Sequence, residues 1–188
     1  SMMVTAAGAD ARMAGAPYSV VANSGSGNQG ITATMPTVAL ARWKGISEEK
    51  MLRAVTMSHL VAIRIKSKFG RLSALCGATV AGTGSACAIT YLLGGDYDAV
   101  CRAVPNMIGN VAGMLCDGAK ADCALKISSC VNAAFQAAFM ALRGVRVQNT
   151  DGIVETDPEH TIDNFAELGN KGSGPLDAAI LHMMLNKK

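Results

Sequence analysis

The chain has 188 residues, enough for one domain of ordinary size, and we expect residues 1–188 to form a single domain. Half of the residues are hydrophobic and 16% are charged, which excludes a chain that stays disordered through excess charge. The net charge of +3 is too small for a nucleic-acid-binding surface, so no nucleic-acid partner is expected. An aromatic content of 4% with 20 glycines favours closely packed helices over a β-sandwich. The predicted fold class is all-α, a compact multi-helix domain.

The start of the chain is expected to be only partly ordered. Ser1 precedes a methionine, as in a remnant left by cloning, and residues 1–16 are predicted to be a partly ordered lead-in. They lack the basic and apolar segments of a targeting signal. Six cysteines without such a signal argue against a disulfide framework and favour a reduced, cytoplasmic protein.

In chain order, the first predicted elements are a loop and two helices. Residues 23–30 read NSGSGNQG and form the loop. Residues 31–41 form a helix, with Pro36 best placed in its first turn, where a missing N–H is easily tolerated. Ser47, followed by two glutamates, caps a longer helix that runs to residue 69 and stops at Gly70.

The segment 72–95 has no charged residue over 24 positions, which is long enough for a membrane span. It contains five glycines and many Ala, Ser and Thr residues, so its transfer into lipid is only weakly favourable. We therefore expect a buried, Gly/Ala-rich central helix that neighbouring backbones approach closely, and no membrane partner.

The remaining predicted elements are helices separated by turn signals. Asp96 caps a helix through residue 104, and Pro105 bends or restarts it. A further helix covers residues 119–143. The tail contains a short helix at 162–168, a loop at 170–174 and a last helix at 175–186.

The cysteines allow two interpretations. They are Cys76, Cys87, Cys101, Cys116, Cys123 and Cys130, and they lack the C-x-x-C and histidine pairs of structural zinc sites. The last three are seven residues apart and would form one apolar stripe on an unbroken helix. Alternatively, the helix breaks at Asp117-Gly118, so that Cys116 ends one helix and Cys123 faces the same point from the next. The N–H groups of the second helix, and Lys120, would then favour an anionic thiolate cluster.

The polar turn at residues 23–30 also has two interpretations. It lacks the ending of a Walker phosphate-binding loop and does not follow a clear strand, as a dinucleotide-binding turn would. Its amides, hydroxyls and backbone N–H groups favour a nest for a carboxylate, and the alternative is a flexible linker. Among the histidines, His59 is expected to be hydrogen-bonded in the core, with His160 and His182 at the surface.

Three motifs in this order resemble the serine dehydratase α-chain family. They are NSGSGNQGI at residues 23–31, LCGATVAGTGSAC at 75–87 leading into YLLGG at 91–95, and NMIGNVAGMLCDGAK at 106–120. The resemblance extends from about residue 18 to the end of the chain. The most similar branch is that of the L-cysteine desulfidase-like proteins.

The resemblance implies an all-helical domain that binds a [4Fe–4S] cluster through Cys76, Cys116 and Cys123, with the fourth iron open to substrate. Cys87, Cys101 and Cys130 are then spare. The implied reaction is α,β-elimination on a small L-amino acid, in which L-cysteine gives pyruvate, ammonia and sulfide. The substrate carboxylate would lie in the polar turn, on Asn23, Ser24, Gly25, Ser26, Gly27, Asn28 and Gln29.

The resemblance also implies that part of the enzyme lies outside this chain. Relatives in the desulfidase branch are longer at the N-terminus and carry the proposed catalytic base there. We therefore expect this chain to be the C-terminal, cluster-binding portion, inactive alone, with the N-terminal part of its own full-length chain as a partner and a homo-oligomer as a further possibility. Two alternatives stay open: an L-serine ammonia-lyase, and a non-catalytic helical domain for self-association or regulation.

Overall fold

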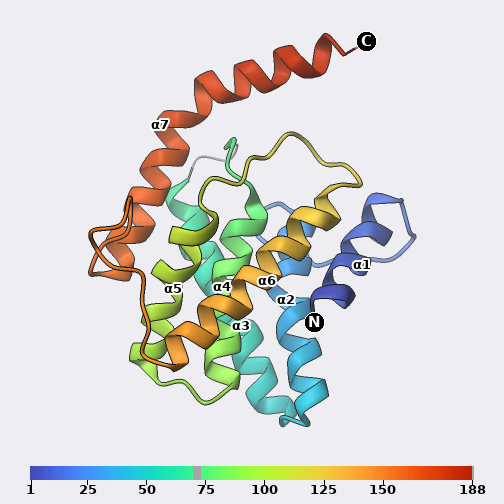
Figure 1. Cartoon of the computed structure of the whole chain (residues 1–188). Helices are drawn as coiled ribbons and strands as arrows, with labels where there is room; N and C mark the ends of the chain where they lie inside the picture. Colours follow the sequence, from blue (N-terminus) through green and yellow to red (C-terminus); the bar gives the residue numbers. More distant parts are fainter. Residues whose placement is uncertain (70–72, 188) are drawn as a thin grey trace.

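Helix α4 (Gly77–Leu92) forms the centre of the molecule, and α2, α3, α5 and α6 pack around it (Figure 1). The computed structural model describes residues 1–69 and 73–187. Over these residues the chain forms helices and no β-strand, which confirms the predicted all-α class. The other helices are α1 (Met2–Met13), α2 (Gly27–Lys44), α3 (Glu48–Lys68), α5 (Tyr97–Val111), α6 (Cys123–Leu142) and α7 (Pro158–Leu185).

The small residues of α4 let its neighbours approach closely, as predicted for a Gly/Ala-rich central helix. Every residue from 78 to 90 is buried. A Cβ atom added to Gly84 would lie 2.1 Å from the backbone oxygen of Ser58 in α3. A Cβ atom added to Gly82 would lie 2.6 Å from the Met107 side chain in α5. The predicted start of this uncharged segment at Leu72, like the predicted helix stop at Gly70, lies outside the described residues.

Helix α2 begins at Gly27, so the prediction that it starts at residue 31 with Pro36 in its first turn is wrong. Pro36 lies inside the helix and has no N–H to offer the carbonyl of Thr32, four residues earlier. Ser85 of α4 donates a hydrogen bond to that carbonyl at 2.6 Å. Tertiary packing thus replaces the hydrogen bond that proline removes.

Helices α5 and α6 also differ from their predicted bounds. Asp96 caps α5 as predicted, accepting a hydrogen bond from the Ala99 N–H at 2.8 Å. The helix then continues through Pro105 to Val111. Helix α6 begins at Cys123, four residues after its predicted start.

The N-terminal segment forms a helix that was not predicted from the sequence. Residues 2–13 form α1, which packs against α2 and α6 and buries Thr5 and Ala9. This part of the chain thus contributes a packed helix where the sequence indicated only a lead-in.

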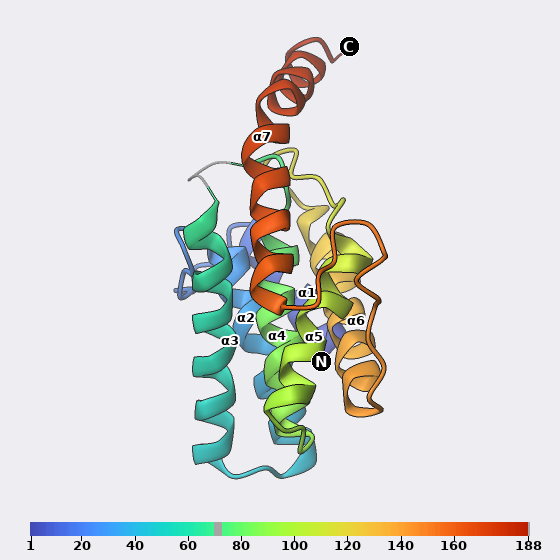
Figure 2. The ribbon, with the colours of Figure 1, turned by 90° about the vertical axis from the view of Figure 1, so that its left-hand side faces the viewer.

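A single helix, α7, replaces the predicted helix, loop and helix of the tail. Its first half packs on α3 and α5, and Ser73 and Ala74 contact Ser173 of its middle turn, where the Ser173 hydroxyl accepts from the Ala74 N–H at 2.9 Å. These contacts support the helical form of the Gly-rich stretch that the sequence indicated as a loop. Figure 2 shows that the second half extends beyond the other helices, and its side chains are mostly exposed.

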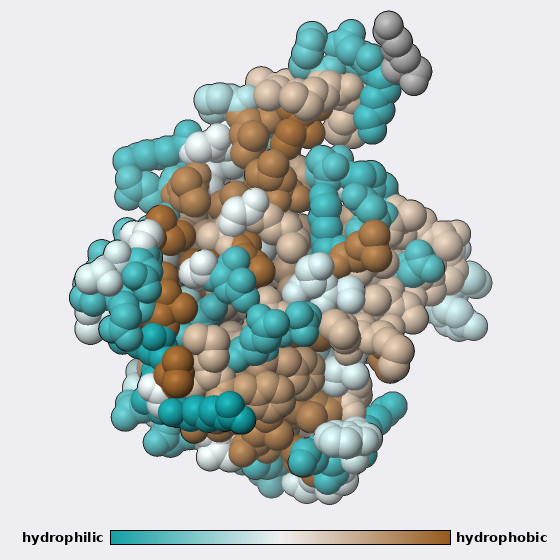
Figure 3. Space-filling model, viewed as in Figure 1, coloured by the Kyte–Doolittle hydropathy of each residue, from teal (hydrophilic) through white to brown (hydrophobic). Residues whose placement is uncertain are grey.

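By length and composition, α6 is the one helix among the described residues that is apolar enough to cross a membrane. Of its most apolar window, 44% is buried against the rest of the protein. Core helices of water-soluble proteins meet the same criterion, so this is weak evidence for a span. On the face that α6 crosses, Figure 3 shows hydrophilic and hydrophobic residues side by side.

Candidate functional site

The N-terminal ends of α2, α4 and α6 enclose a cavity of about 260 Å³. Cys76, Cys116 and Cys123 all line this cavity, so three thiols that are distant in the sequence share one space. Its other lining residues are Arg12, Gly25, Ser26, Asn28, Gln29, Gly77, Ala78, Gly118, Ala119, Lys126 and Ile127. Helix N-termini carry partial positive charge and free N–H groups, so the cavity favours anions.

Two short backbone segments fix the positions of Cys76 and Cys116. The Cys76 N–H donates to the Met114 carbonyl at 2.8 Å, and the Cys116 N–H donates to the Ala74 carbonyl at 2.7 Å. These bonds surround an antiparallel bridge between Leu75 and Leu115. Because alternate residues of paired extended segments point to opposite faces, the two cysteines lie diagonally opposite each other on one face.

Cys123 reaches the cavity because the helix breaks before it. Gly118 has a φ of +98°, a left-handed conformation that glycine adopts readily. The chain turns there, and α6 starts at Cys123, whose Sγ lies 3.8 Å from the Gly118 carbonyl oxygen. The chain does turn at Asp117-Gly118 as predicted, but Cys116 does not end a helix, because α5 already ends at Val111 and Cys116 follows the bridge residue Leu115. The alternative of one stripe through Cys116, Cys123 and Cys130 is wrong because Cys116 precedes the helix.

The polar turn is a tight hairpin followed by a helix start. Asn23 and Ser26 exchange two backbone hydrogen bonds of 3.0 and 2.9 Å. Ser24 and Gly25, between them, have φ values of +49° and +84°, as in a type I′ turn. The Ser26 hydroxyl caps α2 by accepting from the Gln29 N–H at 3.3 Å. Of the loop predicted over residues 23–30, only residues 23–26 are non-helical, and the residues from Gly27 onward belong to α2.

The structure brings only part of the predicted carboxylate-binding set to the cavity. Gly25, Ser26, Asn28 and Gln29 line it. Asn23 is 2% exposed and directs its side chain to other protein groups, Gly27 is buried outside the lining, and Ser24 is exposed. Gln29 lies directly on the start of α4, because a Cβ atom on Gly77 would be 2.5 Å from its Oε1.

Two cations that sequence reasoning missed also line the cavity. Arg12 comes from α1 and donates to the Asn28 side-chain oxygen at 3.0 Å. Its segment was expected to be a lead-in, and no local sequence signal places it here. Lys126 follows Cys123 by one helical turn, a spacing from which its position could have been predicted. The Lys120 side chain, expected to contribute, lies outside the lining and pairs with Asp117 at 2.6 Å.

Burial and neighbouring charge set the ionisation of these groups. Burial raises the pKa of Cys76, and negative charge at the neighbouring sulfur atoms adds to the increase, while an N–H hydrogen bond from Ala78 and the positive charge of Lys126 oppose it. Burial tends to lower the pKa of Lys126, but its ion pair with Asp117 produces a net increase. Lys126 is therefore a cation at neutral pH.

The cysteines assigned as spare differ in their surroundings. Burial raises the pKa of both Cys87 and Cys130 to about 12, which keeps them as thiols in the core. Cys101 is half-buried. All six cysteines are free. Among the described residues, no three His, Cys, Asp or Glu side chains form a preassembled metal-binding group, so the triad shares a cavity without being closed into a ligand set.

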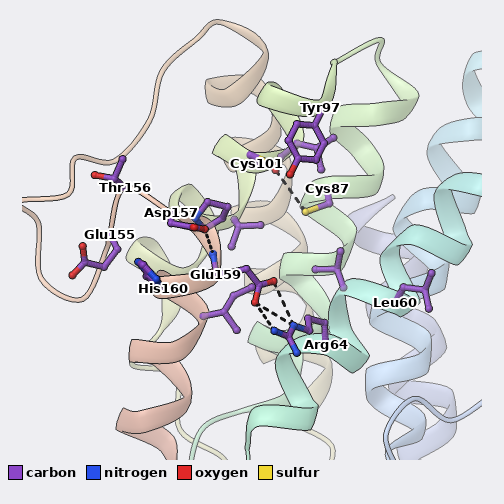
Figure 4. A pocket seen from close by; sticks show the side chains of 15 residues that line it. Leu60, Arg64, Cys87, Tyr97, Cys101, Glu155, Thr156, Asp157, Glu159 and His160 are labelled. Atoms are coloured by element: carbon purple, nitrogen blue, oxygen red, sulfur yellow. Dashed lines mark hydrogen bonds and ion pairs between the residues drawn. The ribbon is translucent and has the colours of Figure 1, made fainter.

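A larger cavity of about 920 Å³ lies between α3, α5 and the start of α7 (Figure 4). Three of its charged side chains are engaged with neighbouring groups: Arg64 and Glu159 form an ion pair of 2.8 Å, and Asp157 caps α7. Figure 4 shows Tyr97 and Cys101 at its upper side and Leu60 on α3. The cavity has none of the cysteine triad, and we assign it no catalytic role.

His59 of α3 lies behind the polar turn, half-buried, with hydrogen bonds to both ring nitrogens. Asn23 Nδ2 lies 3.0 Å from Nδ1, and Thr34 Oγ1 lies 2.8 Å from Nε2. His59 is hydrogen-bonded as expected but is half-buried and not part of the core, and the expected exposure of His160 and His182 is confirmed.

Acidification is expected to destabilise the protein through His59. Burial lowers the pKa of His59, so below the ordinary histidine value of about 6.5 the unfolded chain binds a proton that the folded chain does not. The stability that neutral His59 provides is complete above that pH and falls as the pH drops toward the lowered pKa. Urea unfolding at about pH 8 and pH 6 measures the loss. If the His59→Asn variant lost as much stability between these two pH values as the unmodified protein, the loss could not be assigned to His59.

The fold and site define an all-helical domain with a cysteine-lined cavity that favours anions. The family described as serine dehydratase alpha chain matches residues 1–182, and this chain belongs to it.

The chain is 50% identical over its whole length to a UPF0597 protein of Oleidesulfovibrio alaskensis, covering 44% of that protein. It is 51% identical over 98% of its length to a UPF0597 protein of Phocaeicola vulgatus, and 52% identical over 97% to one of Shewanella pealeana. These matches cover 43% and 42% of the two proteins. The chain thus spans less than half the length of these relatives, and no solved structure matches it.

Proposed function

We propose that this chain is the cluster- and substrate-binding part of an iron–sulfur lyase that performs α,β-elimination on a small L-amino acid. The preferred substrate is L-cysteine, which with water gives pyruvate, ammonia and hydrogen sulfide. The observation that carries the proposal is the shared cavity of Cys76, Cys116 and Cys123 beside the polar turn. Membership of the serine dehydratase alpha chain family supports a lyase of this class.

The donor set fits a [4Fe–4S] cluster. Iron–sulfur clusters are held by cysteine thiolates, and Cys76, Cys116 and Cys123 would supply three. The starts of α4 and α6 and the cation Lys126 would offset the negative charge of these thiolates. A bound cluster with one iron free of protein ligands supplies a Lewis acid for the leaving sulfur or oxygen.

The polar turn and Arg12 would bind the substrate carboxylate. The Ser26 hydroxyl and the Asn28 and Gln29 amides line the cavity at the start of α2, where the helix favours an anion. Arg12 adds a full positive charge and is held in place by Asn28. A carboxylate at this end would leave the α-carbon and the side chain of the amino acid directed toward the thiols.

Lys126 is a poor candidate for the base that removes the α-proton. Its raised pKa keeps it protonated, so it cannot accept a proton at neutral pH. Because the relatives are more than twice as long as this chain, we infer that their additional part supplies the base. Breaking of the C–S bond then gives aminoacrylate, which tautomerises and is hydrolysed to pyruvate and ammonia.

L-Serine is the second candidate substrate, because the family takes its description from serine dehydratase. Elimination of water from serine gives the same pyruvate and ammonia without sulfide. The test is an anaerobic assay of the complete protein for pyruvate and sulfide from both amino acids. Pyruvate without sulfide, from serine alone, would favour the serine enzyme. No pyruvate from either substrate in cluster-loaded protein would contradict the proposal.

Arg12→Gln is expected to raise the KM of the complete enzyme by about tenfold, because a charge-assisted hydrogen bond to the carboxylate is lost. The kcat should change much less, since the carboxylate does not react. Steady-state kinetics measure both quantities. Arg42→Gln, on an exposed part of α2, is the matched control and should leave KM unchanged. An equal KM for Arg12→Gln and the unmodified enzyme would remove Arg12 from the site.

The free state of the cysteines supports a reducing, cytoplasmic location for this enzyme. The partner we propose is the rest of its own longer chain. Self-association is an additional possibility that sedimentation of the complete protein would measure.

A further inference from the structure

The Asn23 side chain connects the polar turn to α3: its oxygen bonds to residues of the turn and its NH2 group bonds to His59 of α3. Its Oδ1 accepts from the Ser24 hydroxyl at 2.9 Å and from Gln29 Nε2 at 3.4 Å. Its Nδ2 donates to the His59 backbone carbonyl at 3.3 Å and approaches the His59 ring. An amide has two donor hydrogens and one carbonyl acceptor, so the protein uses all of these groups. Asn23 therefore anchors the turn and has no free donor for a ligand.

These contacts determine which nitrogen of His59 carries the proton. A backbone carbonyl only accepts hydrogen bonds, so the Asn23 group that faces α3 must be its NH2. The same NH2 meets His59 Nδ1, which must then be the unprotonated acceptor. The proton lies on Nε2, which donates to the Thr34 hydroxyl. A proton on Nδ1 would place two donors against each other and push Asn23 away.

We propose that His59 is a positioning residue that, through its Nδ1 acceptor, holds Asn23 and thereby the turn that lines the cavity. Asn23 in turn orients Gln29, whose side chain lies between the turn and Gly77 at the start of α4. His59 does not line the cavity and touches no reacting group. Its effect on substrate affinity rests on the proposed function, whereas its effect on the order of the turn does not.

Two substitutions separate the roles of the ring nitrogens. In His59→Asn the side-chain oxygen can occupy the position of Nδ1 and accept from Asn23. In His59→Gln the amide reaches the position of Nε2, keeps the contact with Thr34 and leaves Asn23 without its ring partner. Thr34→Val removes the opposite contact and is the matched control.

Hydrogen exchange and kinetics of the complete protein test the proposal. In His59→Gln, we expect amide exchange of residues 24–29 to accelerate and KM for L-cysteine or L-serine to rise, each by about tenfold, with kcat within about twofold. His59→Asn should restore both to within about threefold, and Thr34→Val should resemble the unmodified protein. Unchanged exchange in His59→Gln, or no rescue by His59→Asn, would overturn the proposal. If the unmodified protein shows no lyase activity, the proposed function fails, and the exchange rates still decide the role of His59.

Discussion

Gly84→Ala is expected to lower the free energy of unfolding by about 3 kcal/mol, because overpacking at a rigid contact forces the backbone to move. The new Cβ atom would lie 2.1 Å from the Ser58 backbone oxygen and 3.0 Å from its carbonyl carbon. Neither atom belongs to a flexible side chain, so α3 and α4 would have to separate. Urea unfolding followed by circular dichroism measures the change.

Gly172→Ala is the matched control for this prediction, since it also adds one methyl group to a helical glycine. Its nearest neighbour is the tip of Leu168 at 4.0 Å, an ordinary contact. Alanine in a helix is favoured over glycine, so we expect a gain of up to about 1 kcal/mol. Equal stabilities of the two variants would show that the close approach of α3 to α4 is not a constraint.

Replacing Cys76, Cys116 or Cys123 by serine is expected to lower kcat/KM of the complete enzyme on the order of 100-fold or more. Loss of a residue that only hydrogen-bonds to a metal ligand already lowers activity, and loss of the ligand itself should lower it further. A serine hydroxyl remains protonated near neutral pH and is a poor ligand for an iron–sulfur cluster. Anaerobic assays of pyruvate formation after reconstitution with iron and sulfide measure the effect.

Cys101→Ser is the control, because Cys101 is half-buried as Cys116 and Cys123 are, but lines a different cavity. It should keep activity within about twofold of the unmodified enzyme, as expected for a residue outside the site. Loss of activity in all four variants would point to general damage by the substitution. Full activity in Cys116→Ser would exclude the thiol from the site.

The sequence predicted the features that local chemistry decides. Ser47 and Asp96 cap their helices as expected, since a short polar side chain can bond the free N–H groups of the first turn. The turn at Gly118 was also predictable, because glycine enters the left-handed region more readily than other residues. Composition alone did not predict that Cys76, Cys116 and Cys123 share one site; that prediction came from the family resemblance. The structure places all three around one cavity.

Features that depend on tertiary contacts were mispredicted. Pro36 lies inside α2 because Ser85, 49 positions later, bonds the carbonyl that proline leaves free. The stretch at residues 170–174 is helical, with Ser173 bonded to the segment after α3. Arg12 reaches the cavity because α1 packs beside the start of α2. Each outcome depends on a partner that no local window of sequence contains.

Mössbauer spectroscopy of the anaerobically reconstituted complete protein tests the central claim most directly. We predict a [4Fe–4S] signal in which one iron changes its parameters when L-cysteine or L-serine is added, and which is lost in Cys76→Ser, Cys116→Ser and Cys123→Ser but kept in Cys101→Ser. Iron uptake that is the same in the unmodified protein and the three cavity variants would contradict the assignment of these cysteines as the cluster ligands.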